Sequence, residues 1–296
     1  MEQGPNEFTF HIDGRPGCLQ RGRIFGHDNS IYPFEEGYIA KKATPNELRF
    51  YRYYKGNLTE FFPNSLLPEI LGIVYFEKPI SEFYAHEEVK IDAYPDLNLH
   101  ETNHIPYLVQ KDVAAGFTQP AILDLKVGTR TWRIGASKKK AARRTAKNLR
   151  GPNGITKFRV RGAIWYSNNP EKWNKEDHLS YVGRDFSTKC SLEELKEFLS
   201  DFFKHRNELQ FVIKKLNKLE EGLKRLHERN IRFYSSSVLI VYDEKNPEKV
   251  DCRLLDFEKS YLDFTKAADE FGESYESCDD EIVSAVANLK DILKNI

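Results

Sequence analysis

The sequence has few cysteines and none of the spacings at which cysteine usually carries chemistry. Its four cysteines, Cys18, Cys190, Cys252 and Cys278, are scattered through 296 residues, and no CxxC pair occurs. The pattern therefore indicates neither a disulfide framework nor a thiolate zinc site. We expect a reducing compartment, the cytoplasm first and the nucleus second.

The sequence also lacks long apolar runs and an excess of charge of either sign. Nowhere do 18 apolar residues follow one another, and the N-terminal stretch MEQGPNEFTFHIDG has no apolar signal core. We therefore expect a soluble protein without stable membrane insertion. We also expect a monomer. The 45 basic and 45 acidic residues balance. A net charge of zero argues against a dedicated nucleic-acid partner.

Common catalytic motifs are absent or occur in the wrong context. No Walker A loop, G-x-S-x-G elbow or G-x-G-x-x-G fingerprint is present. The stretch His100-Glu-Thr-Asn-His104 satisfies the H-E-x-x-H pattern, but a zinc peptidase needs this pattern on a helix. Here it follows YPDLNL and precedes Pro106 by two residues, so we interpret it as a loop. A zinc peptidase is one rival interpretation, which stoichiometric zinc would support.

The pattern of predicted elements changes near residue 113. Residues 1–113 have strand-like stretches and one helix, which begins at the capping sequence Thr44-Pro-Asn-Glu47. Residues 114–296 contain a basic helix over 137–150, a capping box at 191–194, a hairpin over 236–258 and a C-terminal helix. We expect the acidic stretch 268–281 to be mobile. The chain thus divides into an N-terminal lobe, 1–113, and a C-terminal lobe, 114–296.

A long basic run is the strongest charge feature. Between Leu125 and Pro170 no aspartate or glutamate occurs. The run contains thirteen basic residues: Lys126, Arg130, Arg133, Lys138, Lys139, Lys140, Arg143, Arg144, Lys147, Arg150, Lys157, Arg159 and Arg161. A solvated face in a neutral protein normally mixes both signs, so the run indicates an anionic ligand.

Helical spacing divides residues 138–150 into two sides. Six cations would share one side: Lys139, Lys140, Arg143, Arg144, Lys147 and Arg150. The opposite side carries Ala142, Ala146 and Leu149, by which we expect the helix to dock. Nucleic acid and an anionic membrane are both possible ligands of this side, although few aromatic residues accompany the cations, which weakens the case for single-stranded nucleic acid. A small polyphosphate would also explain the density of cations, because six phosphates carry roughly −9 to −12 charges.

Two charges stand in an otherwise apolar predicted strand, PAILDLKVG. Asp124 and Lys126 are two residues apart and therefore share one strand face, where an unpaired buried ion would be costly. A second apolar strand ends at Asp256-Phe257, where a carboxylate could hold Mg²⁺ on nucleotide phosphates or simply cap a turn. Lys41 or Lys42 and Glu47 could form a kinase-type Lys–Glu pair, although Glu47 also fits a capping box.

These stretches together resemble the inositol polyphosphate kinase family. PAILDLKVG matches the family signature P-x-x-x-D-x-K-x-G. PNELRFY (45–51), LVQKDV (108–113), RFYSSSVLIVYD (232–243) and RLLDF (253–257) resemble its N-lobe helix, hinge, Ser-Ser-Leu-Leu segment and metal-binding Asp-Phe, in family order. The sequence departs from the family at DFEKS (256–260), where Ala-His would follow Asp-Phe. DLKVGTR and RFYSSS are most similar to the inositol hexakisphosphate kinases.

The resemblance implies roles for individual residues. Asp124 would orient the attacking group or accept its proton, Lys126 would hold substrate phosphate, and Asp256 would ligate Mg²⁺ with Ser236 nearby. The implied ATP contacts are Lys41, Glu47, Asp112 and Asp256. The implied inositol phosphate contacts are Lys126, Arg133, Lys140, Arg144 and Lys147, most of them in a basic segment at about 133–170.

The implied fold is α+β, a two-lobed, protein-kinase-like (ATP-grasp-like) architecture with a helical inositol-phosphate-binding insertion. The implied activity is ATP- and Mg²⁺-dependent phosphorylation of inositol hexakisphosphate, which yields a pyrophosphate. An inositol polyphosphate multikinase or trisphosphate 3-kinase, which phosphorylates a ring hydroxyl, is the alternative within the family. A non-catalytic module that binds polyanions such as phosphoinositides or RNA is the alternative outside it.

Overall fold

The computed structural model describes residues 6–11, 31–33, 37–80, 88–93, 97, 103–172, 174, 179–204 and 206–296. The chain forms two compact units. The N-terminal unit comprises residues 1–59 and 68–116, and the C-terminal unit comprises residues 60–67 and 117–296. The H-E-x-x-H stretch begins outside the described residues, since His100, Glu101 and Thr102 are not among them.

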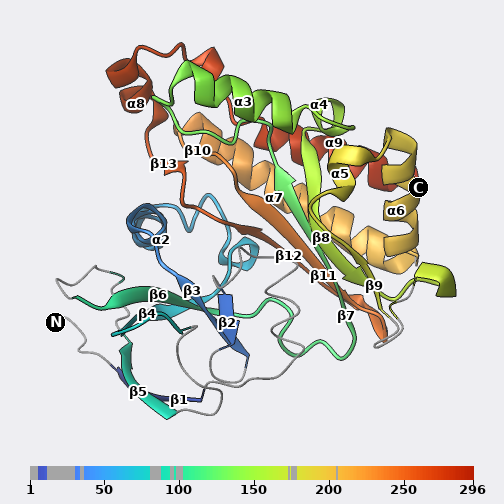
Figure 1. The fold of residues 1–296 in the computed structure, drawn as a ribbon, viewed down its shortest axis with the longest axis horizontal. Helices are drawn as coiled ribbons and strands as arrows, with labels where there is room; N and C mark the ends of the chain where they lie inside the picture. Colours follow the sequence, from blue (N-terminus) through green and yellow to red (C-terminus); the bar gives the residue numbers. More distant parts are fainter. Residues whose placement is uncertain are drawn as a thin grey trace. The chain divides into compact units, whose positions relative to one another are not determined.

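The N-terminal unit is built on an antiparallel sheet of four strands in the order β2-β3-β6-β4. These strands span Ile31–Pro33, Tyr38–Lys42, Ile105–Lys111 and Ile70–Phe76 (Figure 1). Strands β1 (Asn6–His11) and β5 (Glu88–Ala93) form a separate pair. Ala40, Val74, Phe76, Tyr107 and Val109 form a buried cluster on the larger sheet. Helix α2 (Pro45–Asn57) begins after Thr44, whose side chain accepts a hydrogen bond from the Glu47 amide.

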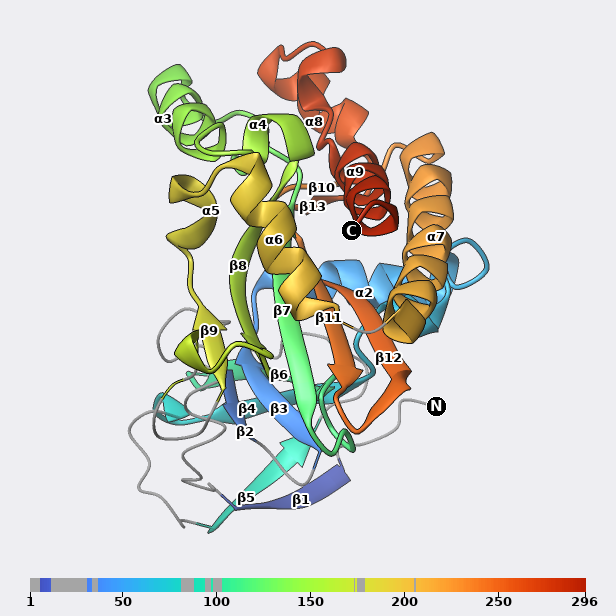
Figure 2. The same cartoon turned by 90° about the vertical axis from the view of Figure 1, so that its right-hand side faces the viewer.

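The C-terminal unit contains an antiparallel sheet in the order β12-β11-β7-β8-β9. Its strands span Asn246–Leu255, Ser237–Asp243, Pro120–Val127, Phe158–Trp165 and Ser180–Val182. Strand β7, which carries Asp124 and Lys126, therefore lies at the centre between β11 and β8 (Figure 2). The predicted hairpin over 236–258 is confirmed by the pairing of β11 with β12.

Two long helices pack on this sheet. Helix α7 (Arg206–Glu228) contacts β12, and α9 (Ile282–Lys294) contacts α7, β7 and β8. Val212, Leu216, Leu219, Leu223 and Leu226 recur at helical spacing along α7 and are all buried. The predicted capping box is present at the start of α6 (Leu192–Phe202). No helix in the described part of the chain is long and apolar enough to cross a membrane.

Short elements complete the C-terminal unit. They are η1 (Asn64–Leu66), α4 (Asn153–Thr156), η3 (Pro170–Lys172), α5 (Phe186–Lys189), β10 (Arg232–Phe233), β13 (Ser260–Tyr261), α8 (Phe264–Phe271) and η4 (Glu276–Cys278). The stretch 268–281, expected to be mobile, is anchored at several points. Ala268, Cys278 and Asp280 are buried, and Glu273, Asp280 and Glu281 pair with Arg130, His227 and Lys157.

The basic helix α3 (Lys138–Asn148) docks through a different face from the predicted one. The Asn148 amide is buried and donates hydrogen bonds to the Thr129 carbonyl and the Thr131 hydroxyl, both at 2.7 Å. These bonds fix the rotation of the helix, so Ala142, Ala146 and Leu149 point to solvent. The prediction that they form the docking face is wrong, because a buried amide with two partners outweighs two alanines and a leucine.

Candidate active site

Asp124 and Lys126 share a face of β7 and meet polar neighbours on both adjacent strands. In the register, Lys126 stands opposite Arg159 of β8 and Ser237 of β11. Both charged side chains are buried within β7, whose other residues are apolar. An ion in this position needs compensation from charges or hydrogen bonds that reach the same face.

A β-bulge in β8 places a further cation beside Asp124. The register shifts between Asp124 and Leu125, whose partners are Gly162 and Val160, so Arg161 is the inserted residue. A bulge of this kind redirects a side chain, and bulges are common next to active sites. Arg161 interacts electrostatically with Asp124 and Asp256.

The open end of the β11–β12 hairpin surrounds the Lys126 ammonium. Lys126 Nζ donates to the Ser235 carbonyl and lies 3.9 Å from Asp256 Oδ2. Ser235 and Asp256 both have left-handed backbones, with φ of +69° and +66°. The Ser236 hydroxyl donates to the Asp256 carbonyl at 2.8 Å and ties the two strand ends together. Such conformations are costly for residues other than glycine and cluster at functional sites.

Burial shifts the pKa values of Asp124 and Lys126 toward the neutral form of each group. Burial raises the pKa of Asp124 to about 6, and the nearby Asp256 carboxylate adds to this rise. Burial lowers the pKa of Lys126 to about 8, although Asp256 acts against this shift. One oxygen of Asp124, Oδ1, is buried without a hydrogen-bond partner. An orphaned carboxylate oxygen on a polar face is typical of a group that awaits a ligand or a proton.

Several cations gather around this pair. Burial and the neighbouring Arg161 and Arg144 lower the pKa of Arg159 to about 10. Burial and nearby Arg144 likewise lower the pKa of Lys259. We call six of these residues the cationic wall: Arg133, Lys140, Arg144, Arg159, Arg161 and Lys259. Within the described residues none of the six forms an ion pair with a carboxylate. An anion bound here would relieve their mutual repulsion.

The structure brings together most of the predicted substrate residues. Lys259 interacts electrostatically with Arg133, Lys140 and Arg144, and Arg144 reaches Arg159. Arg159 faces Lys126 across the β7–β8 register. Lys147 lies one turn beyond Arg144 on α3 and is exposed to solvent.

Three of the four predicted ATP residues, Lys41, Glu47 and Asp112, lie in the N-terminal unit, whereas Asp256 lies in the C-terminal unit. Lys41 Nζ, on β3, lies 2.9 Å from Glu47 Oε1 in the first turn of α2, and both side chains are largely buried. The Glu47 amide therefore donates to the capping hydroxyl of Thr44, while the Glu47 carboxylate pairs with Lys41. Asp112 follows β6, and its side chain accepts a hydrogen bond from the Ala114 amide.

Four residues of the site were not among the predicted ones: Arg159, Arg161, Ser235 and Lys259. Arg159 and Arg161 were members of the basic run, and their alternation along one strand could have singled them out. Lys259 lies in DFEKS, the stretch that departs from the family pattern. Nothing in the local sequence identifies Ser235 as the carbonyl that accepts from Lys126.

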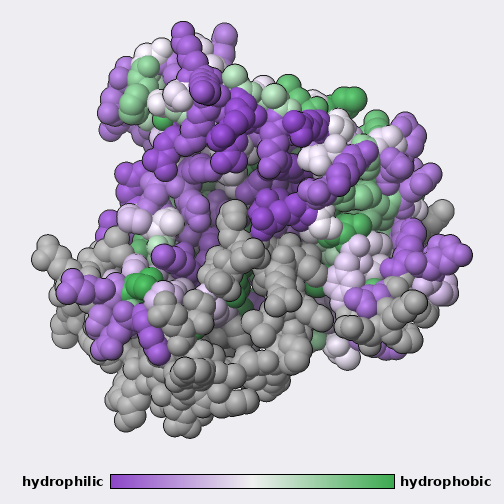
Figure 3. All heavy atoms as spheres, in the orientation of Figure 1, coloured by the Kyte–Doolittle hydropathy of each residue, from purple (hydrophilic) through white to green (hydrophobic). Residues whose placement is uncertain are grey.

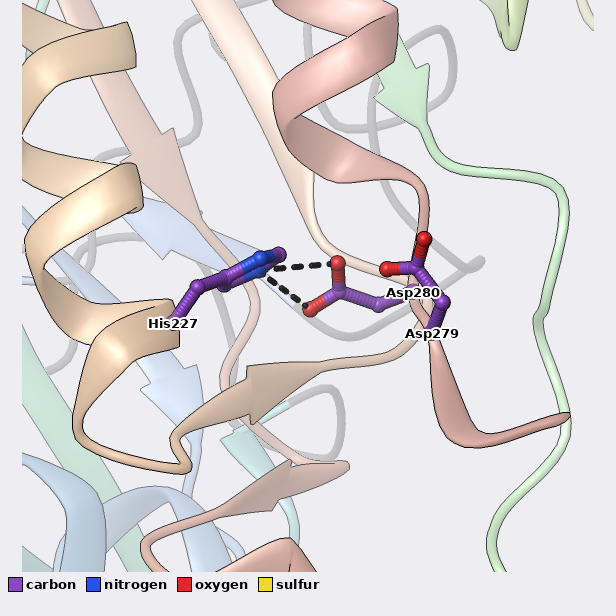
Figure 4. Close-up of side chains that lie close together, drawn as sticks. All are labelled: His227, Asp279 and Asp280. Carbon is purple, nitrogen blue, oxygen red and sulfur yellow. Dashed lines mark hydrogen bonds and ion pairs between the residues drawn. The ribbon is translucent and has the colours of Figure 1, made fainter. Parts of the chain in front are cut away.

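One further cluster contains possible metal ligands. His227, Asp279 and Asp280 offer ligand atoms within 4.8 Å of one another. Figure 4 shows the imidazole of His227 directed at the Asp280 carboxylate, with the Asp279 side chain beside it. The Asp280 oxygens also accept hydrogen bonds from the amides of Phe233 and Ile282. Both oxygens of this buried carboxylate thus bind groups of the protein, and we interpret the cluster as structural.

Comparison with known proteins identifies the family. A model of the family described as inositol polyphosphate kinase matches residues 107–294, which include β7, the basic helix and the β11–β12 hairpin. The chain belongs to this family. The fold agrees: the inositol phosphate multikinase Ipk2 from S. cerevisiae, solved in complex with ADP and Mn²⁺, superposes with a TM-score of 0.61 at 20% identity. The match covers 87% of this chain and 98% of Ipk2.

The family relatives most similar in sequence include inositol hexakisphosphate kinases. Inositol hexakisphosphate kinase 3 of Mus musculus is 30% identical over 72% of this chain and 55% of its own. Inositol hexakisphosphate kinase 2 of Homo sapiens is 30% identical over 60% of this chain and 41% of its own. The present chain thus spans about half the length of these relatives. The predicted resemblance to this family, most like the hexakisphosphate kinases, and the predicted α+β kinase-like fold are confirmed.

Proposed function

We propose that this protein is an ATP- and Mg²⁺-dependent kinase that phosphorylates inositol hexakisphosphate and forms an inositol pyrophosphate. The observation that carries the proposal is the buried Asp124–Lys126 pair, with Asp256 on one side and the cationic wall on the other. A highly charged acceptor and a transferring phosphoryl group both need concentrated positive charge beside a carboxylate.

The cationic wall and Lys126 bind the acceptor. Six phosphates carry roughly −9 to −12 charges, which exceeds what one or two cations can neutralise. Lys126 holds the phosphate nearest the reacting atoms, because its ammonium is fixed by the Ser235 carbonyl. Most of the catalysis is then positioning and charge neutralisation, since an acceptor phosphate oxygen is already ionised and needs no general base.

The site fits a divalent cation at Asp256. Its side chain is 39% exposed, and its carboxylate raises the pKa of Asp124, so the two acidic groups repel each other. A Mg²⁺ ion on Asp256 would offset this repulsion and would neutralise charge on the transferring phosphates. Asp124 then orients the attacking oxygen, and Ser236 holds the Asp256 backbone in place.

The N-terminal unit would supply the nucleotide contacts. The Lys41–Glu47 ion pair orients the Lys41 ammonium for ATP phosphates, as in protein kinases. Asp112, which follows β6, would accept hydrogen bonds from the ribose hydroxyls. The bond from the Ala114 amide to Asp112 Oδ1 holds this carboxylate in a defined orientation.

One observation favours a second candidate, a kinase for the ring hydroxyls of less phosphorylated inositols. Asp124 has a pKa of about 6, which lies close to the operating pH. A carboxylate of this kind is a better general base than an ordinary aspartate, and a hydroxyl acceptor must lose a proton during transfer. A hexakisphosphate acceptor has no free hydroxyl and gains nothing from this property.

A product analysis tests the proposal. The chain is incubated with Mg-ATP and inositol phosphates from tris- to hexakisphosphate, and the products are separated by anion-exchange chromatography. We expect a more highly charged product from the hexakisphosphate. Transfer to the trisphosphate alone would support the hydroxyl kinase, and binding without transfer to any acceptor would support the non-catalytic polyanion-binding module.

A further inference from the structure

The orientation of α3 separates its cations into two groups. Lys140, Arg144 and Lys147, at spacings of four and three, follow the flank that reaches Lys259 and Arg159. Lys139 and Arg143 are exposed on another part of the helix surface, and Arg150 is exposed just beyond the C-cap of the helix. Within the described residues none of these three forms an ion pair. The acceptor site therefore leaves a second set of cations unused.

Apolar side chains accompany this second set. Ala142, Ala146 and Leu149 point to solvent, because the Asn148 amide fixes the rotation of the helix. Leu149 is 49% exposed and lies against Gly154 of α4, where Ile155 is 71% exposed. Figure 3 shows hydrophobic surface beside a hydrophilic area over α3 and α4. We call Lys139, Arg143, Arg150, Leu149 and Ile155 the outer patch.

We propose that the outer patch docks this protein on a lipid bilayer that carries anionic headgroups. Leu149 and Ile155 would enter the interface between headgroups and acyl chains, while Lys139, Arg143 and Arg150 would contact the lipid phosphates and carboxylates. No acidic residue occurs from Lys126 to Asn169, so nothing in α3 or α4 repels an anionic surface.

The observations favour a bilayer over a macromolecular partner. The exposed apolar surface consists mainly of two aliphatic side chains, far less than the roughly 1,000 Å² that a stable protein interface requires. Residues 138–156 contain no aromatic side chain on which nucleic-acid bases could stack. A fluid bilayer, by contrast, can accommodate two protruding side chains, and its anionic headgroups attract cations that are spread over a surface.

Vesicle co-sedimentation tests the proposal. Phosphatidylcholine vesicles with and without phosphatidylserine are mixed with the wild-type chain, with Leu149→Ser/Ile155→Ser, and with Lys139→Gln/Arg143→Gln/Arg150→Gln. We expect binding only to the anionic vesicles and a loss of about tenfold or more in each variant. The matched control is Lys214→Gln/Lys218→Gln/Arg225→Gln, which removes three exposed cations from α7 and should bind like the wild type.

Two further measurements separate the outer patch from the acceptor site and from self-association. Vesicle binding should persist in excess soluble inositol hexakisphosphate, which occupies the cationic wall. Three results would overturn the proposal: the wild type fails to bind anionic vesicles, inositol hexakisphosphate abolishes its binding, or both outer-patch variants bind as strongly as the wild type. Sedimentation velocity should show a monomer, whereas a dimer that Leu149→Ser/Ile155→Ser dissociates would make the patch a contact between two copies. None of these readouts requires kinase activity.

Discussion

Two neighbouring parts of the C-terminal unit bury charge, and they compensate it differently. Arg130, three residues after β7, donates to Glu273 at 2.8 Å and to the Ser277 carbonyl, and its guanidinium stacks on Trp132 and Tyr234. Asp124, in β7 itself, keeps a buried oxygen without a hydrogen bond and has a pKa of about 6.

The difference teaches how to interpret a buried charge. A charge that is held by a close opposite charge, as Arg130 is by Glu273 through its Nη atoms although its Nε has no hydrogen-bond partner, favours one arrangement of the chain and has little left to offer a ligand. A buried carboxylate with a raised pKa, such as Asp124, lowers stability when it is ionised and can gain from a bound phosphate group or metal ion. Charge counting along the sequence does not distinguish these two kinds of charge.

The largest effect should follow from breaking the ion pair between Arg130 and Glu273. Arg130→Ala would leave Glu273 without its main partner and remove the stacking on Trp132 and Tyr234. We expect the free energy of unfolding to fall by about 3–5 kcal/mol, as for other buried ion pairs that lose one member. Urea unfolding followed by tryptophan fluorescence measures this change.

The control for this prediction is Arg133→Ala, which removes an exposed arginine three residues later and should change stability by less than about 0.5 kcal/mol. The double variant Arg130→Ala/Glu273→Ala should recover part of the loss, because it leaves no uncompensated carboxylate. A loss in Arg130→Ala no larger than that in Arg133→Ala would contradict the assignment of Arg130 as structural.

The next largest effect should be a loss of activity in a variant of Lys126. Lys126→Met removes the ammonium beside Asp256 and keeps an apolar chain of similar length. We expect kcat/KM for phosphate transfer to fall about 10²–10³-fold, since a preorganised charge next to the transferring group is lost. Stability should fall less than in Arg130→Ala, because the lost ammonium has a lowered pKa and the carboxylate it leaves at Asp256 is 39% exposed to solvent. Lys139→Met, on exposed α3 surface, is the matched control, and equal activity in the two variants would argue against a role for Lys126.

Local patterns in the sequence predicted the local structure well. Alternation in PAILDLKVG placed Asp124 and Lys126 on one strand face, and capping residues located the starts of α2 and α6. The kinase family followed from several such stretches in order. Each of these features depends on residues within about one element, where propensity and periodicity are informative.

Features that depend on distant partners were missed or predicted incorrectly. The rotation of α3 is set by Asn148 bonding to Thr129 and Thr131, and Arg130 finds its carboxylate 143 residues away in Glu273. The left-handed backbones of Ser235 and Asp256 arise where two paired strands end together. No periodicity in the chain encodes such contacts, because the fold alone brings the residues together.

A smaller effect should reveal whether Asp124 acts as a base or only as a positioning group. Asp124→Asn keeps the shape of the side chain but cannot accept a proton. With a hydroxyl acceptor we expect a loss of about 10²-fold or more in kcat. With inositol hexakisphosphate the loss should stay below about tenfold, because the attacking oxygen is already ionised. Parallel turnover measurements with both acceptors give the ratio, and equal losses would count against this role.

The smallest effect is a pH-dependent gain in stability from the same variant. The folded-state pKa of Asp124, about 6, lies above the ordinary value of 3.8. The stability that this carboxyl contributes is therefore fully present below pH 3.8 and is lost as the pH rises through 6. Relative to the wild type, Asp124→Asn should be about 1–3 kcal/mol more stable near pH 7 and nearly equal near pH 4. Urea unfolding across this range tests the window, with Asp185→Asn as the exposed control. A constant difference at all pH values would mean that burial does not raise the pKa of Asp124 in the folded chain.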